Sequence, residues 1–218
     1  MKIVIVVPAY NESRYISSFL QKLKAMHYPI VVVDDGSTDQ TAARAREQGV
    51  TVLTHMVNLG KGAAVKTGCE YAFRKLGAAA VIIMDGDDQH AVGDIAQFTR
   101  ALKDGAEVVL GVRAMDAKMP LYRLLGSKFA SILINLIFGR YIADIPSGFK
   151  AFTRQAYQKL RWHSAGYEVE TEIAVRLAKS RLPYTEVPIS TIYHGKEYGF
   201  NLLDAARILL KLPYWLWS

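Results

Sequence analysis

The chain has 218 residues, of which 51% are hydrophobic, and it carries a formal net charge of +7 and a single cysteine. This length fits one domain, or one domain with an elaboration, and the lone Cys69 excludes an intramolecular disulfide and fits a reducing compartment. No apolar stretch reaches the ~18 residues of a membrane span, and the apolar run at residues 3–7 is too short for a signal peptide.

Charge divides the chain into two unequal halves. Residues 1–110 hold 12 basic and 12 acidic side chains, whereas residues 111–218 hold 15 and 8, so the second half carries the whole basic excess. A basic excess can serve nucleic acid, anionic lipid or a phosphorylated substrate. No nucleic-acid-binding motif accompanies it, so we expect no nucleic-acid partner.

In the first half, short apolar runs rich in β-branched residues alternate with amphipathic segments. The expected strands are residues 2–7, 30–33, 50–54, 78–84 and 107–110, and the expected helices are residues 13–24, 39–48, 58–75 and 92–102. Strands that alternate with helices at this spacing predict an α/β fold with a parallel, doubly wound sheet.

The second half has a different pattern. We expect a nearly all-apolar helix at 120–138, a loop at 144–153, an amphipathic helix at 167–179 and an edge strand at 184–189, because prolines limit its ladder. The segment 199–218 contains a basic amphipathic helix followed by Tyr and Trp residues. That composition indicates an interfacial anchor, with a docked or dimer-forming helix as the alternative.

Three carboxylates follow the apolar run that ends at Met84, in the stretch Met84-Asp85-Gly86-Asp87-Asp88-Gln89-His90. The carboxyl ends of strands in open α/β sheets are where ligands bind. Clustered carboxylate oxygens suit Mg²⁺ or Mn²⁺, which keep waters and share substrate phosphates. Gly86 permits a phosphate or ribose to approach the backbone closely. We therefore predict a metal and nucleotide site here, with a solvated acidic turn as the alternative.

Other strand ends carry polar groups that suit a nucleotide. Tyr10 can stack on a base, and Glu12, Asp34 or Asp35 can accept hydrogen bonds from a base or ribose. Lys61 lies at a helix N-terminus, where backbone N–H groups already favour a diphosphate. The stretch Gly60-Lys61-Gly62 lacks the spacing of a Walker A loop. No G-x-G-x-x-G follows the first strand, which argues against a site for a dinucleotide cofactor.

These motifs occur in the order seen in one enzyme family. The stretches Val7–Glu12, Asp34–Asp39, Asn58–Gly62 and Asp85–His90, followed by Gly111–Arg113 and Asp144–Lys150, resemble family-2 glycosyltransferases with the GT-A fold, in the dolichol-phosphate mannose synthase and polyprenyl-phosphate glycosyltransferase branch. The resemblance implies a mixed, mostly parallel Rossmann-like sheet flanked by helices, with amphipathic interface helices at the C-terminus. It also implies a divalent cation, Mg²⁺ or Mn²⁺, as cofactor.

The resemblance also implies roles for individual residues. The nucleotide-sugar site would contain Pro8, Tyr10, Glu12, Val33, Asp35, Lys61, Asp85, Gly86 and Asp87. The metal would lie at Asp85, Asp87 and Gln89. The acceptor phosphate would be held by Arg123, Ser127 and Lys150. Asp85, Asp87, Arg113 and Arg123 would serve catalysis, with Arg113 neutralising the diphosphate.

One departure from the family pattern bears on the acceptor. Family members that transfer to hydroxyl groups carry a Glu-Asp pair whose Asp is the base, whereas the stretch Glu168–Glu172 has no Asp. A hydroxyl acceptor needs a general base, but a phosphate acceptor is already anionic and needs cations such as Arg113 and Arg123. The alternatives are transfer to a sugar or protein hydroxyl with Glu170 or Glu172 as base, and a nucleotide-sugar-binding protein without turnover.

The sequence therefore predicts an inverting, metal-dependent glycosyltransferase that moves a sugar from a GDP- or UDP-sugar to a polyprenyl phosphate. Residues 1–198 would form the GT-A domain, with a nucleotide-sugar half at 1–110 and an acceptor half at 111–198. The amphipathic segment 199–218 would hold the protein on an anionic membrane surface, at its cytoplasmic face.

Overall fold

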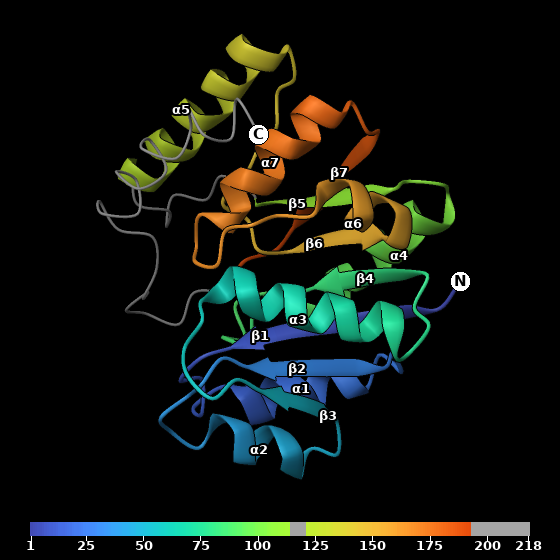
Figure 1. The fold of residues 1–218 in the computed structure, drawn as a ribbon, viewed down its shortest axis with the longest axis vertical. Helices are drawn as coiled ribbons and strands as arrows, with labels where there is room; N and C mark the ends of the chain where they lie inside the picture. The colour runs from blue at the N-terminus through green and yellow to red at the C-terminus, as the bar shows by residue number, and fades with distance from the viewer. Residues whose placement is uncertain (114–120, 193–218) are drawn as a thin grey trace.

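The computed structural model describes residues 1–113 and 121–192, and for residues 121–127 and 129 it describes the backbone only. Within these ranges the fold is one seven-stranded sheet with helices on both faces (Figure 1). The strands, in chain order, are β1 (Ile3–Ala9), β2 (Ile30–Asp34), β3 (Thr51–Thr54), β4 (Ala80–Ile83), β5 (Val108–Arg113), β6 (Lys150–Thr153) and β7 (Tyr184–Ile189). The helices are α1 (Ile16–Lys24), α2 (Thr41–Glu47), α3 (Lys61–Arg74), α4 (Ile95–Lys103) with a 3₁₀ turn at Val92–Asp94 before it, α5 (Leu121–Phe138), α6 (Arg154–Leu160) and α7 (Val169–Ser180).

The strand order is β3-β2-β1-β4-β6-β5-β7, and β6 alone among these strands runs antiparallel to its neighbours. The expected mixed, mostly parallel α/β sheet is therefore confirmed. The chain runs outward from β1 through β2 to β3 and then crosses back to place β4 on the other side of β1. This reversal creates a switch point between β1 and β4, where open α/β sheets bind ligands.

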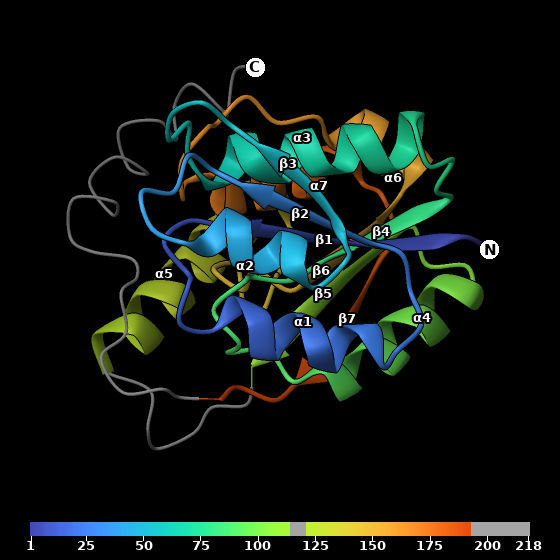
Figure 2. The same cartoon turned by 90° about the horizontal axis from the view of Figure 1, so that it is seen from below.

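Helices lie on both faces of the sheet (Figure 2), and a separate cluster of buried apolar side chains fills the space on each face. Side chains of β1, β2 and β4 that point to one face pack with α3, α6 and α7, around the fully buried Trp162 and Phe152. Their alternating neighbours pack with α1 and α4, around Phe19, Phe98 and Phe149. Cys69 is buried on α3 as a free thiol, as expected for a small core residue.

The prediction of a loop over residues 144–153 was wrong at its end. Lys150–Thr153 form β6 in the middle of the sheet, with Lys150 paired to both Ile83 of β4 and Leu110 of β5. Thr153 then caps α6, because its Oγ1 accepts a hydrogen bond from the Ala156 N–H at 3.2 Å. The edge position predicted for residues 184–189 is confirmed, since β7 pairs with β5 at the end of the sheet.

Candidate active site

Polar side chains from the ends of four strands gather where the parallel strands of the sheet end. Asp34 ends β2 and Asp35 follows it, Asp85 follows β4, and Arg113 ends β5. Because β6 is antiparallel, its first residue, Lys150, lies at the edge where the parallel strands end. The structure therefore brings together side chains that the sequence placed in separate loops.

The centre of this edge is acidic. Burial and the nearby carboxylates of Asp87, Asp85 and Asp39 raise the pKa of Glu12 to about 7. Burial and the charge of Asp85 likewise raise the pKa of Asp87 above its ordinary value. Like charges raise a carboxyl pKa where they repel one another through a poorly solvated site. Glu12, Asp85 and Asp87 therefore give this end of the sheet its negative charge.

The acidic loop is fixed by its neighbours. The Gln89 N–H donates to Asp87 Oδ1 at 3.0 Å, and the Ile192 N–H donates to the Gln89 carbonyl at 2.9 Å. His90, which the sequence did not single out, lies with Nε2 3.5 Å from Asp85 Oδ2 and packs against the ring of Phe149. No sequence signal distinguishes this histidine from a core residue, because its role depends on contacts between distant segments.

Lys61 is clamped on Asp85 rather than standing free. Its Nζ lies 2.8 Å from Asp85 Oδ1, 2.9 Å from Oδ2 and 3.1 Å from Glu170 Oε1. Burial disfavours the charged forms of Lys61 and Asp85, but the opposite charge of the partner outweighs the effect of burial on each group. The pKa of Lys61 is accordingly raised by Asp85 and Glu170, and the pKa of Asp85 is held well below its usual range by Lys61 and His90.

Gly148 makes room for this pair. A Cβ built at residue 148 would overlap the Asp85 carboxylate and would lie 2.8 Å from Lys61 Nζ. The loop that leads into β6 can therefore lie against the Asp85–Lys61 pair only because residue 148 has no side chain.

The two glutamates considered as bases point to different places. Glu170 faces the site, where its two oxygens contact the ammonium groups of Lys61 and Lys150. Lys150 is itself buried and also donates to the Ser147 carbonyl. Glu172 faces away from the site into the protein, and its carboxylate accepts hydrogen bonds from the His163 and Ser164 N–H groups.

We expect Glu172→Gln to lower the free energy of unfolding without removing a catalytic group. The fully buried carboxylate accepts two backbone N–H donors and the Arg176 Nε at 2.7 Å, so an amide there loses about 1–3 kcal/mol. Burial opposes this charge, but these donors outweigh it and lower the pKa of Glu172. Its stabilisation is therefore complete above the ordinary glutamate range and is lost as pH falls through the folded pKa. Urea unfolding at pH 7 and pH 3 checks this, and equal differences between variant and wild type at both values would contradict it.

The residues expected around a nucleoside are placed as follows. Tyr10 is 45% exposed beside Glu12, and the Pro8 carbonyl accepts a hydrogen bond from the Gly86 N–H at 3.2 Å. The side chain of Val33 is fully buried in the core under α3, so its backbone alone reaches the edge.

Asp35 organises the segment before α3. Its carboxylate accepts hydrogen bonds from the Leu59 N–H at 3.0 Å and the Gly60 N–H at 2.7 Å. His55 Nδ1 lies 2.7 Å from the same carboxylate, and His55 Nε2 lies 3.0 Å from Thr67 Oγ1. Asp35 therefore fixes the turn that delivers Lys61 to the site.

Arg113 is held by Asp144. Its backbone N–H and Nε donate to Asp144 Oδ2 at 3.0 and 2.8 Å, and its NH2 group donates to Oδ1 at 2.9 Å. This bidentate pairing fixes the plane of the guanidinium at the edge of the sheet. Arg123 and Ser127 belong to the first turns of α5, and their side chains lie outside the described residues.

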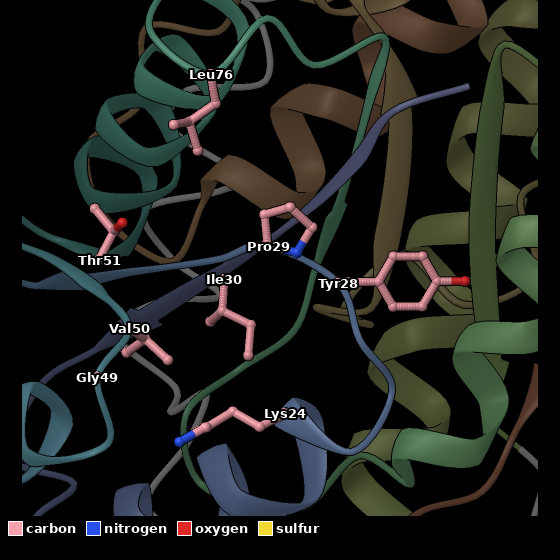
Figure 3. A pocket seen from close by; sticks show the side chains of 8 residues that line it. All are labelled: Lys24, Tyr28, Pro29, Ile30, Gly49, Val50, Thr51 and Leu76. Atoms are coloured by element: carbon pink, nitrogen blue, oxygen red, sulfur yellow. The ribbon is translucent and has the colours of Figure 1, made fainter.

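A separate pocket of about 340 Å³ lies at the other end of the strands, where β2 and β3 begin (Figure 3). It is lined by residues that include Ile30 and Thr51, the first residues of β2 and β3, and Tyr28 and Lys24. The acidic cluster lies where the parallel strands end, so this pocket does not belong to it.

The switch point between β1 and β4, the acidic loop after β4 and Arg113 at the end of β5 together form a polar site of the kind that binds ligands in open α/β sheets. Residues 4–161 match glycosyl transferase family 2, and the chain belongs to this family and is a glycosyltransferase.

The sequence is similar to named proteins over almost its whole length. It is 32% identical to a UDP-N-acetylglucosamine–dolichyl-phosphate N-acetylglucosaminyltransferase of Methanococcus voltae, over 96% of this chain and 94% of the relative. It is 27% identical to a polyprenol monophosphomannose synthase of Mycolicibacterium smegmatis, over 97% of this chain and 86% of the relative.

The fold also matches solved structures. A glucosyl-3-phosphoglycerate synthase from Mycobacterium tuberculosis, in complex with Mn²⁺, UDP and glucosyl-3-phosphoglycerate, superposes with a TM-score of 0.75 at 19% identity, over 99% of this chain and 78% of that chain. At this identity the likeness shows the GT-A fold.

Proposed function

We propose that the protein transfers a sugar from a nucleotide diphosphate sugar to a polyprenyl phosphate, with inversion at the anomeric carbon. The observation that carries the proposal is the state of the two candidate bases. Both oxygens of Glu170 already contact ammonium groups, and Glu172 is turned into the protein against backbone N–H donors. Neither is placed to take a proton from a hydroxyl, and a phosphate acceptor requires no such step.

In this proposal the first half binds the donor. Tyr10 and Glu12 face the base and ribose, with Pro8 and Val33 contributing backbone, and Asp35 holds the turn before Lys61. Gly86 lets the diphosphate approach the acidic loop, and Arg113 opposes its charge as the bond to the sugar breaks. The sugar is transferred with inversion because an oxygen of the acceptor phosphate attacks the anomeric carbon from the side opposite the nucleoside diphosphate, which leaves with the electrons of the broken bond.

The acidic centre fits a divalent cation at Asp85, Asp87 and Gln89. Among the described residues no basic side chain forms an ion pair with Glu12 or Asp87, whereas Asp85 is paired with Lys61. Burial and the neighbouring carboxylates raise the pKa values of Glu12 and Asp87. The described part of the chain has no group of three or more His, Cys, Asp or Glu side chains arranged to hold a metal unaided. Mg²⁺ or Mn²⁺ bound there would share diphosphate oxygens and add positive charge at the leaving group.

The relatives support the same assignment. The names of the Methanococcus and Mycolicibacterium proteins specify dolichyl phosphate and a polyprenol phosphate product, and fold neighbours were solved with UDP and Mn²⁺ or Mg²⁺. For this chain we propose acceptor contacts from Arg123 and Ser127. Lys150 is buried against Glu170, so we assign it to support of the site and not to direct contact with the acceptor phosphate.

A lipid acceptor places the site near a membrane surface. No helix in the described part of the chain is long and apolar enough to cross a bilayer. On α5, Ile132 and Leu136 are 52% and 77% exposed, which leaves an apolar face available for the interface. We propose peripheral binding at the cytoplasmic face of an anionic membrane; the amphipathic segment 199–218, also assigned to this role, lies outside the described residues.

We expect the protein to co-sediment with anionic vesicles at low salt and to be released as salt rises, because each basic residue near the surface contributes roughly 1 kcal/mol within a Debye length. Leu136→Asp should weaken co-sedimentation, whereas Asp104→Asn, at the exposed C-cap of α4, should not. Wild-type protein that stays in the supernatant at low salt would contradict the membrane assignment.

The decisive test of function is the mass of the product. Purified protein is incubated with Mn²⁺, a UDP- or GDP-sugar chosen from those nucleotides that raise its Tm, and a short-chain polyprenyl phosphate. We expect a product heavier than the lipid phosphate by one glycosyl unit. Transfer to a sugar or peptide hydroxyl, with no lipid product, would establish the alternative function.

A further inference from the structure

Four side chains of alternating charge form a row that joins the two halves of the chain. In order they are Asp85, Lys61, Glu170 and Lys150, contributed by the loop after β4, α3, α7 and β6. The contacts are Asp85 to Lys61 at 2.8 Å, Lys61 to Glu170 at 3.1 Å, and Glu170 to Lys150. Side-chain exposure falls along the row from 24% for Asp85 to 4% for Lys150, so the row runs from the site into the protein.

The Lys61 ammonium is held between two carboxylates. It donates a hydrogen bond to Asp85 Oδ2 at 2.9 Å, and it forms ion pairs with Asp85 Oδ1 at 2.8 Å and with Glu170 Oε1 at 3.1 Å. These contacts restrain the orientation of the Asp85 carboxylate, the group that lies beside Asp87 and His90.

The ion pair with Glu170 limits the positions that the Lys61 ammonium can take. Without its charge, the Lys61 ammonium is attracted by Asp85 alone and is repelled by Lys150, which contacts the other oxygen of the same carboxylate. Lys61 already contacts both Asp85 oxygens, so both changes would shift the ammonium around that carboxylate and turn the carboxylate with it.

We propose that Glu170 is a positioning residue: through Lys61 it sets the orientation of Asp85, and Lys150 holds the other oxygen of the Glu170 carboxylate in place. The inference rests on the proposed function, because Asp85 matters for transfer only if it holds the donor. It gives Glu170 a role other than that of a general base.

The test uses two variants to separate an effect of Glu170 on nucleotide binding from an effect on stability. The first removes the charge of Glu170, and the second also removes the charge of its partner Lys150. Glu170→Gln leaves Lys150 buried without a counter-charge, so the Tm should fall. The double variant Glu170→Gln/Lys150→Met removes both members of that pair and should recover most of the Tm. Glu70→Gln is the matched control, since Glu70 lies on α3 with Lys61 but pairs with Arg74 and Arg161 at the surface.

The readout is the Kd of UDP or GDP, measured by calorimetry with Mn²⁺ present, with acceptor absent. In both Glu170 variants we expect the Kd to rise about 10- to 100-fold, the range typical when a residue that orients a metal ligand is lost. In Glu70→Gln it should equal that of the wild type. The positioning role would be established if the Tm falls in Glu170→Gln and recovers in Glu170→Gln/Lys150→Met, while the nucleotide Kd stays raised in both variants.

Two results would overturn the inference. If the double variant recovers both Tm and Kd, Glu170 merely neutralises Lys150. If Glu170→Gln binds nucleotide like the wild type but turns over ~10²–10⁴-fold more slowly, Glu170 is a general base. Failure of wild type and Glu70→Gln alike to bind either nucleotide would instead overturn the proposed function, and the positioning role with it.

Discussion

We expect Asp87→Ala to lose at least ~10²-fold in transfer rate, the loss typical of removing one strong electrostatic stabiliser from an active site. Asp87 lies in the acidic centre, where burial and Asp85 raise its pKa. Removing it takes away a proposed cation ligand and also relieves the repulsion on Glu12, so the pKa of Glu12 should fall. The fold should persist, because the Asp87 side chain makes one described hydrogen bond, from the Gln89 N–H. Initial rates with a lipid phosphate, measured over a range of Mn²⁺ concentrations, provide the measurement.

The matched control is Asp104→Asn, which removes a carboxylate at the exposed C-cap of α4 and should change neither rate nor metal dependence. Nucleotide affinity in Asp87→Ala should no longer depend on Mn²⁺. Full activity of Asp87→Ala, or of the wild type in excess chelator, would refute the metal role.

Gly148→Ala should abolish most transfer for a steric reason. The added methyl group would overlap the Asp85 carboxylate and would approach Lys61 Nζ to 2.8 Å. Asp85 has a short side chain, so it can make room only by turning out of the orientation that Lys61 imposes. A displacement of about 1 Å at such a group can cost ~10²-fold in rate. Steady-state kinetics and a thermal melt, run on the same preparation, separate the loss of activity from any loss of fold.

Gly93→Ala is the control for this substitution. Gly93 lies in the 3₁₀ turn before α4, and a Cβ there would meet no atom within 4 Å. The two variants make the same chemical change in neighbouring loops, and we expect activity to fall in Gly148→Ala alone. Wild-type kcat/KM in Gly148→Ala would show that Asp85 tolerates reorientation and that its clamped position is not needed.

Local pattern was sufficient to predict most of the fold. The β-branched run at the start of the chain became β1, and Pro183 and Pro188 correctly marked β7 as an edge strand. The strand β6 was missed because four residues that begin with a lysine and run into a helix carry no strand signal. Its partners, Ile83 and Leu110, are distant in sequence, and pairing of that kind leaves no local trace.

The site was predicted less completely. Motif order placed the acidic loop, Glu12 and Arg113 at one sheet edge, and the structure brings them to that edge. The partners of individual side chains were not predictable, because they depend on tertiary contacts. Asp35 is occupied by backbone N–H groups, and Lys61 is shared between Asp85 and Glu170, although each looked free to bind substrate in the sequence.

The position of β6 has a consequence for how the chain can be divided. In the sheet β5 pairs with β6 and β7, both of which come from the second half of the chain. A fragment that ends at residue 113 would therefore leave β5 without a partner and β4 with an open edge. During synthesis the place between β4 and β5 stays empty until residue 153 has been made, and the sheet is complete only once β7 follows at residue 189. The proposed donor and acceptor halves therefore share one sheet, and we expect neither to fold when it is excised.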